Sequence, residues 1–147
     1  MKIRTTKAYL RELAEADRRY HAMQEKFEAF RQGALHLAQP GYSLKGIEVK
    51  NEEHSSFIVR FLGATVRFAF QYDHAASRGV VVVTTLAKNG EPSGPTWSFR
   101  FNGEGEVAEI EPRPNEGVYN ITIDTDAAEI VLAALNIALT GEIEGVG

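Results

Sequence analysis

Residues 57–70 read FIVRFLGATVRFAF, two runs in which apolar residues alternate with polar or small ones on either side of Gly63. Such alternation is typical of β-strands that bury one face. With Gly63-Ala64 as a two-residue turn, the two runs form a hairpin whose apolar residues share a face. The expected pairs are Phe61 with Val66, Val59 with Phe68, and Phe57 with Phe70.

The period of two recurs from residue 44 to residue 124, with Gly, Asn, Asp or Pro between the runs. The connections are too short for crossover helices, which predicts an antiparallel meander of six or seven strands. The expected strands are Leu44–Lys50, Ser56–Leu62, Thr65–Tyr72, Gly79–Leu86, Thr96–Phe101, Glu106–Glu111 and Val118–Asp124. Residues 88–95 and 112–117 are expected to be flexible loops.

Before the sheet, residues 6–38 predict one long helix that ends at Gln39-Pro40-Gly41, with Gly33 loosening its last turn. Its apolar or small residues alternate in steps of four and three. They are Tyr9, Leu13, Ala16, Tyr20, Met23, Phe27, Phe30, Ala34 and Leu37. A helix of about 30 residues measures roughly 45 Å, whereas a seven-residue strand covers about 23 Å. The helix should therefore overhang the sheet.

After the sheet, residues 125–140 predict a short helix that is apolar around most of its circumference and therefore buried. Asp126 and Glu129 have the spacing of a capping box at its start. Residues 141–147 are expected to form a flexible tail. Together these elements predict a single α+β domain over residues 1–147.

Composition narrows the possible functions. The chain has 147 residues, no cysteine and a net charge of −4, with 16 basic against 20 acidic residues. The lack of cysteine excludes disulfides, thiolate metal sites and cysteine nucleophiles. The acidic balance makes nucleic acid an unexpected partner. There is no signal-peptide core or apolar run long enough for a membrane span, so we expect a cytoplasmic protein.

Three arginines are the candidate ligand-binding residues. The expected hairpin sets Arg60 opposite Arg67, where two like charges destabilise the sheet unless an anion lies between them. Arg100 alternates with Trp97, Phe99 and Phe101 and should project to the same face.

Two explanations fit this cluster. Internal carboxylates explain such pairs more often, and the candidates are Glu48, Glu106, Glu109 and Glu111. Alternatively, the guanidinium groups bind a phosphate or carboxylate ligand, for which their planar geometry is suited. In that case Trp97 and Tyr119 are candidates to stack on a base, although such aromatic residues more often belong to the core.

Self-association is the second expectation. The seam of the long helix either covers the sheet of its own chain or pairs with a second copy. Strand residues 80–83 are all valine, which suggests that both faces of the sheet are covered, one by the C-terminal helix and the other by the long helix of the same chain or of a partner. Residues 1–40 carry a net charge of +3 and the remainder −7, so helix and sheet attract each other, within one chain or between two. The residues expected at a dimer contact are Leu13, Tyr20, Met23, Phe27 and Phe30.

Catalysis has little support in the sequence. None of the four histidines has metal-ligand spacing, and no cofactor motif is present. The acid, base and hydroxyl groups around His74 lie in one predicted turn, unlike a triad assembled by a fold. We therefore expect a homodimeric protein-interaction or inhibitor module. A binder of a small anion such as a nucleotide is the alternative, and a hydrolase or transferase using His74 or His54 comes third.

Overall fold

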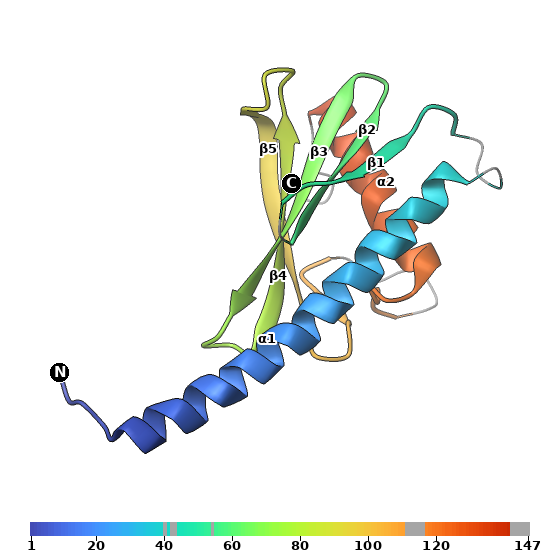
Figure 1. The fold of residues 1–147 in the computed structure, drawn as a ribbon. Helices are drawn as coiled ribbons and strands as arrows, with labels where there is room; N and C mark the ends of the chain where they lie inside the picture. The colour runs from blue at the N-terminus through green and yellow to red at the C-terminus, as the bar shows by residue number, and fades with distance from the viewer. Residues whose placement is uncertain (40, 42–43, 54, 111–116, 142–147) are drawn as a thin grey trace.

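The computed structural model describes residues 1–39, 41, 44–53, 55–110 and 117–141. A long helix, six strands and a second helix follow one another along the chain (Figure 1). The helices are α1 (Thr6–Leu35), with the short 3-10 helix η1 (His36–Ala38) after it, and α2 (Asp124–Thr140). The strands are β1 (Glu48–Asn51), β2 (Ser56–Phe61), β3 (Ala64–Asp73), β4 (Arg78–Leu86), β5 (Pro92–Phe101) and β6 (Val107–Ala108). The predicted α+β fold is confirmed.

The six strands form one antiparallel sheet in chain order, as expected for a meander. Strand β5 is longer than predicted, because it begins at Pro92 inside the expected loop. One edge of β5 pairs with β4, and the other pairs with β6 only at Arg100 and Phe101. At the start of β5 that second edge has no partner strand among the described residues. Proline is tolerated at such an edge because no ladder bond needs its missing N–H.

The expected strand at residues 118–124 does not form. Asn120 makes a single bridge to Glu106, and its side-chain oxygen then accepts hydrogen bonds from the backbone N and the hydroxyl of Thr122. This local hydrogen bonding turns the chain instead of extending it. Strand β6 is also shorter than expected, because Glu109 adopts a positive φ of 73°.

The hairpin that decides the fold has a different register from the one expected. It turns at Leu62-Gly63, both with positive φ, as the twist of a two-residue hairpin requires. Each expected pair is therefore shifted by two residues, and Arg60 lies opposite Thr65 instead of Arg67. A shift of two keeps every side chain on its predicted face.

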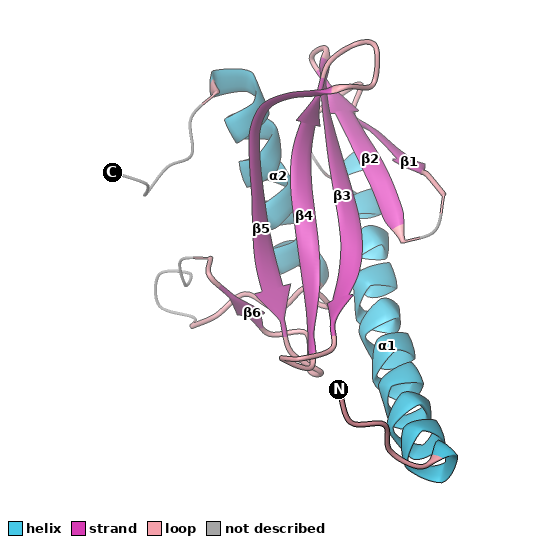
Figure 2. Cartoon of the chain, turned by 90° about the vertical axis from the view of Figure 1, so that its left-hand side faces the viewer, coloured by secondary structure: helices cyan, strands magenta, loops and turns pink. Residues whose placement is uncertain are grey.

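Both helices pack on the same face of the sheet, called the inner face here (Figure 2). Phe30 of α1 is fully buried, with its ring 5.6 Å from those of Phe57 and Phe68 and 5.9 Å from that of Phe99. Figure 2 shows no helix in front of the opposite, outer face. No described helix of the same chain therefore covers the outer side of residues 80–83, where Val80 and Val82 are half-buried. Cover by the long helix of a partner stays a prediction.

The two helices approach each other closely at Gly33. A Cβ atom on Gly33 would lie 2.6 Å from the Cβ of Ala127 in α2. The glycine therefore makes room for α2, and α1 continues through it without a break to Leu35. This corrects the expectation that Gly33 loosens the last turn.

Helix α2 begins and ends close to the predicted residues, but its first turn differs. Ile123 occupies the N-cap position, and Asp126 is fully buried with its carboxylate accepting a hydrogen bond from the backbone N of Asn120 at 2.9 Å. Asp126 therefore ties the helix to the preceding turn and does not form a capping box with Glu129. Gly141 ends the helix in a left-handed conformation. The rest of the expected tail lies outside the described residues.

The predicted overhang of α1 is present. Figures 1 and 2 show α1 continuing past the β3–β4 turn. Arg19 of α1 donates a hydrogen bond to Ser77 in this turn. We call Thr6–Arg18 the arm. No residue of the arm is buried, and the first buried residue of α1 is Met23. Neither of the described helices combines the length and the apolarity needed to cross a bilayer.

Candidate functional site

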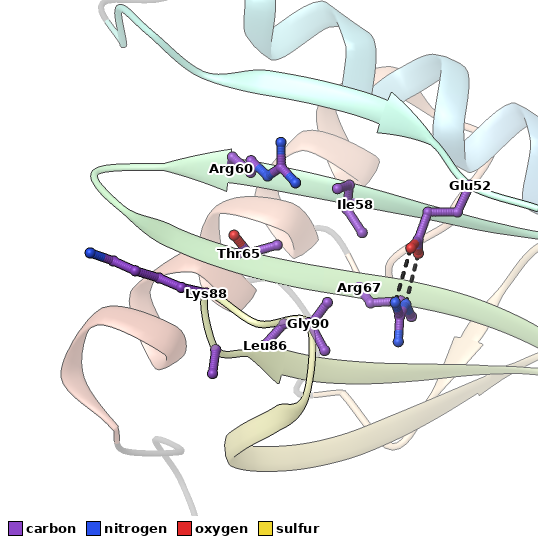
Figure 3. Close-up of a pocket in the computed structure, with 9 residues that line it drawn as sticks. Glu52, Ile58, Arg60, Thr65, Arg67, Leu86, Lys88 and Gly90 are labelled. Carbon is purple, nitrogen blue, oxygen red and sulfur yellow. Dashed lines mark hydrogen bonds and ion pairs between the residues drawn. The ribbon is translucent and has the colours of Figure 1, made fainter.

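The outer face of the sheet carries a groove that brings two of the three predicted arginines together (Figure 3). Its cavity measures about 280 Å³. The lining residues come from β2, β3, the end of β4 and the two adjoining loops: Glu52, Ile58, Arg60, Thr65, Arg67, Leu86, Ala87, Lys88 and Gly90.

A bidentate ion pair closes one end of the groove. Arg67 donates from Nε to one oxygen of Glu52 at 2.7 Å and from Nη2 to the other at 2.9 Å. Hydrogen bonding to Arg67 lowers the pKa of the Glu52 carboxyl group below its ordinary value, and the same bond raises the pKa of Arg67. The internal-carboxylate explanation thus holds for Arg67, although its partner follows β1 and was not among the expected glutamates.

Arg60 lines the same groove but, unlike Arg67, forms no ion pair among the described residues. Glu48 stands opposite it in the register of β1, yet the two side chains form no ion pair. Lys88, in the loop before β5, likewise has no carboxylate within ion-pair distance among the residues that the structure describes. Figure 3 shows the Thr65 side chain between Arg60 and Lys88. Two cations and a hydroxyl group are therefore available at this end.

The loop that carries Lys88 is held by its own backbone. The N–H of Ala87 donates to the carbonyl of Glu91 at 2.8 Å, and that of Gly90 donates to the carbonyl of Ala87 at 2.9 Å. Gly90 has a φ of 84°, a conformation that glycine adopts without strain. Sequence reasoning missed Lys88, because residues 88–95 were assigned to a flexible loop. The Asn89-Gly90 pair is the signal that could have found this ordered turn.

Arg100 projects to the outer face, as predicted, but lies away from the groove. It stands opposite Val80, whereas Arg67 stands opposite Thr84, so the two arginines are about 13 Å apart along the strand direction. Its guanidinium donates to the Glu109 carboxylate at 2.6 Å. Of the other expected glutamates, Glu106 accepts a hydrogen bond from Asn102, and Glu111 lies outside the described residues.

The predicted aromatic residues do not line the groove. Trp97 stands opposite Val83 on the inner face, with its ring 6.0 Å from that of Phe99. Tyr119 is partly buried against the core. Neither faces the outer-face cations.

The residues expected at a dimer contact divide into two groups. Met23, Phe27 and Phe30 are at most 5 % exposed and pack in the core of their own chain. Tyr20 is half-buried beside Phe70 and Tyr72. Leu13, in the arm, is 63 % exposed.

His74 is exposed in the β3–β4 turn beside Tyr72, and His54 lies outside the described residues. In the part of the chain that the structure describes, no three His, Asp or Glu side chains gather into a possible metal site.

Comparison with known proteins gives no relative for this arrangement: no family model, curated protein or solved structure matches the chain.

Proposed function

We propose that the protein is a non-catalytic, homodimeric interaction module in which the arm of α1 binds a second copy of the chain. One observation carries the proposal. Leu10 and Leu13 are each 63 % exposed on a helix whose continuation, from Met23 onward, is the buried centre of the core. Leu13 extends the core-forming seam, and Leu10 is its neighbour one turn earlier on the helix surface; exposed leucines grouped in this way are typical of protein contact surfaces.

The division of the seam limits where that contact lies. Phe27 and Phe30 are occupied by the sheet of their own chain, so a partner reaches them only if the monomer opens. Leu13 is accessible without any rearrangement. The proposed contact is therefore centred on the arm, with Tyr20 at its inner end.

Charge favours the body of a second copy over a second arm. Residues 1–19 contain six basic and three acidic residues, whereas everything after residue 40 carries a net charge of −7. The arm itself carries three basic and three acidic residues and is neutral, so the excess positive charge of residues 1–19 lies beside it, at Lys2, Arg4 and Arg19. Two such N-terminal segments would bring these like charges together, but one N-terminal segment against an acidic body joins opposite charges. We therefore propose reciprocal contacts in which each arm lies on the other copy. A further protein as target and a cytoplasmic location stay predictions from the sequence.

Sedimentation equilibrium at tens of micromolar protein tests this proposal. We expect a dimer for the wild type, and a monomer with unchanged circular dichroism for Leu10→Glu and for Leu13→Glu, since both side chains are exposed in the monomer. Leu62→Glu is the matched control, because Leu62 is 73 % exposed at the β2–β3 turn, away from the arm.

A monomeric wild type would refute the proposal. So would dissociation by Leu62→Glu to the same extent, because it would show that any added charge disperses the protein.

A further inference from the structure

The outer-face groove has the composition of a ligand site in addition to its concave shape. Ile58 and Leu86 are only 5 % and 8 % exposed, although they point to the face that no helix covers. They form an apolar floor, while Arg60 and Lys88 supply charge at the rim. Small-molecule sites commonly combine apolar walls with a few polar groups placed among them.

The charges lining the groove do not balance. Three cations, Arg60, Arg67 and Lys88, line the groove with one anion, Glu52, which is already bound to Arg67 at the other end. Glu48 stands opposite Arg60 in the register of β1 but does not line the groove. Figure 3 shows Lys88 extending away from the Glu52–Arg67 pair. The cations that are not bound to Glu52 are therefore Arg60 and Lys88, and Figure 3 shows the Lys88 side chain directed outward from Thr65. The Thr65 hydroxyl group can donate to an anion.

The size of the groove limits the ligand. Its volume of about 280 Å³ lies just below the range of roughly 300–1,000 Å³ usual for drug-sized ligands. A compact molecule fits this space better than an extended one. An anionic group with a small apolar body matches both the rim and the floor.

We propose that this groove binds a small phosphate monoester or carboxylate with a compact apolar body. The anionic group lies beside Arg60 and Thr65, the flexible Lys88 side chain turns inward to reach it, and the apolar body lies over Ile58 and Leu86. The Glu52–Arg67 pair bounds the site and fixes the direction of the Arg67 side chain. The site lies on the sheet and includes no residue of the arm.

Four probes separate the contributions of charge and of apolar contact. Binding of four probes is measured by titration calorimetry and by the amide chemical shifts of Thr65, Ala87 and Gly90. The probes are phenyl phosphate, benzoate, inorganic phosphate and phenol. We expect phenyl phosphate or benzoate to bind at least about fivefold more tightly than either inorganic phosphate or phenol, which each lack one half of the recognised chemistry. The stronger of the two anionic probes identifies the natural ligand as a phosphate ester or a carboxylate.

Variants assign the binding to the groove. Arg60→Gln and Lys88→Gln should each weaken the better probe by about five- to tenfold, as expected when one charge-assisted contact is lost. Arg78→Gln is the matched control, because Arg78 is exposed on the same face at the far end of the sheet and should leave binding unchanged.

Two results would overturn the inference. One is the absence of shifts at the three groove amides at millimolar concentrations of both anionic probes. The other is an equal loss of binding in Arg78→Gln and Arg60→Gln, which would mean that the probe responds only to the general charge of the sheet.

Discussion

At Gly33 a missing side chain sets how closely two helices approach. In an open helix, replacing glycine by alanine stabilises by about 0.5–1 kcal/mol. Here the added methyl group would meet the Cβ of Ala127 at 2.6 Å. Real Cβ atoms do not approach so closely, so α1 and α2 would have to separate.

We therefore expect Gly33→Ala to destabilise the protein by about 1–3 kcal/mol, the usual range for an overpacked core. Urea unfolding measures the change. The double variant Gly33→Ala, Ala127→Gly should recover part of the loss, because it removes the atom that the new methyl group meets. An increase in stability on Gly33→Ala alone would show that the helices are not in close contact.

Glu52 and Arg67 predict a pH dependence with a definite sign. The pKa of Glu52 is lower in the folded protein than its ordinary value, so between the two pKa values the folded state binds fewer protons than the unfolded state. The pair therefore stabilises the fold above the unfolded pKa of about 4.3, and this stabilisation is lost as the pH falls through the folded value.

Because both side chains of the Glu52–Arg67 pair are partly exposed, the pair contributes about 1 kcal/mol to the free energy of unfolding. The stability difference between wild type and Glu52→Gln should be present at pH 6 and shrink under stronger acid. Glu53→Gln, which alters an exposed neighbouring carboxylate, serves as the control. A difference that is independent of pH would mean that the Glu52 charge contributes nothing.

Among the elements, α1 combines two environments in one helix. Phe27 is 3 % exposed between the rings of Phe57 and Phe70, whereas Leu13 is open to solvent. A glutamate in place of Phe27 becomes a buried charge without a partner, but a glutamate in place of Leu13 remains hydrated.

We expect Phe27→Glu to cost about 3 kcal/mol or more and to lower the melting temperature by roughly 10 °C, or to prevent folding. Leu13→Glu, melted at a concentration too low for association, should match the wild type. Equal melting temperatures for the two variants would show that the buried and exposed parts of α1 have been assigned incorrectly.

The elements also show what the sequence can predict. Apolar residues recur every two residues in the strands and in alternating steps of three and four in the long helix. These periods were sufficient to predict the order of helices and strands, because an element that buries one face must have them. The hairpin register was not determined in this way. Both Leu62-Gly63 and Gly63-Ala64 offer a two-residue turn, and the two registers bury the same side chains.

For the groove, alternation placed Arg60, Arg67 and Arg100 on one face but did not give their distances. Glu52 and Lys88 were missed because both lie outside the regular alternation of the strands, where the backbone path decides what they meet. The expectation that a second helix of the same chain covers the outer face was wrong for a related reason. A run of valines fits a half-covered strand whose neighbours on the sheet shield its outer side chains.

For the whole molecule, the separation of charge between the first 19 residues and the remainder predicts how association depends on salt. Raising the salt concentration from about 0.1 M to about 1 M shortens the Debye length from about 10 Å to about 3 Å and screens the attraction between the basic residues beside the arm and an acidic body. We expect the dissociation constant of the proposed dimer to increase over this range in sedimentation equilibrium. A constant that decreases instead would favour two N-terminal segments paired through the leucines of their arms, since screening relieves the repulsion between the basic residues beside the arms.

The unbroken path of α1 from solvent into the core has one more consequence. An isolated helix as short as the arm is marginal in water, because its first turn must form before later turns can add to it. In the intact protein the buried turns around Phe30 supply that nucleus, and the arm forms by propagation from it. Loss of the core would therefore melt the arm as well, so that only correctly folded chains present it and misfolded copies are left out of the proposed dimer.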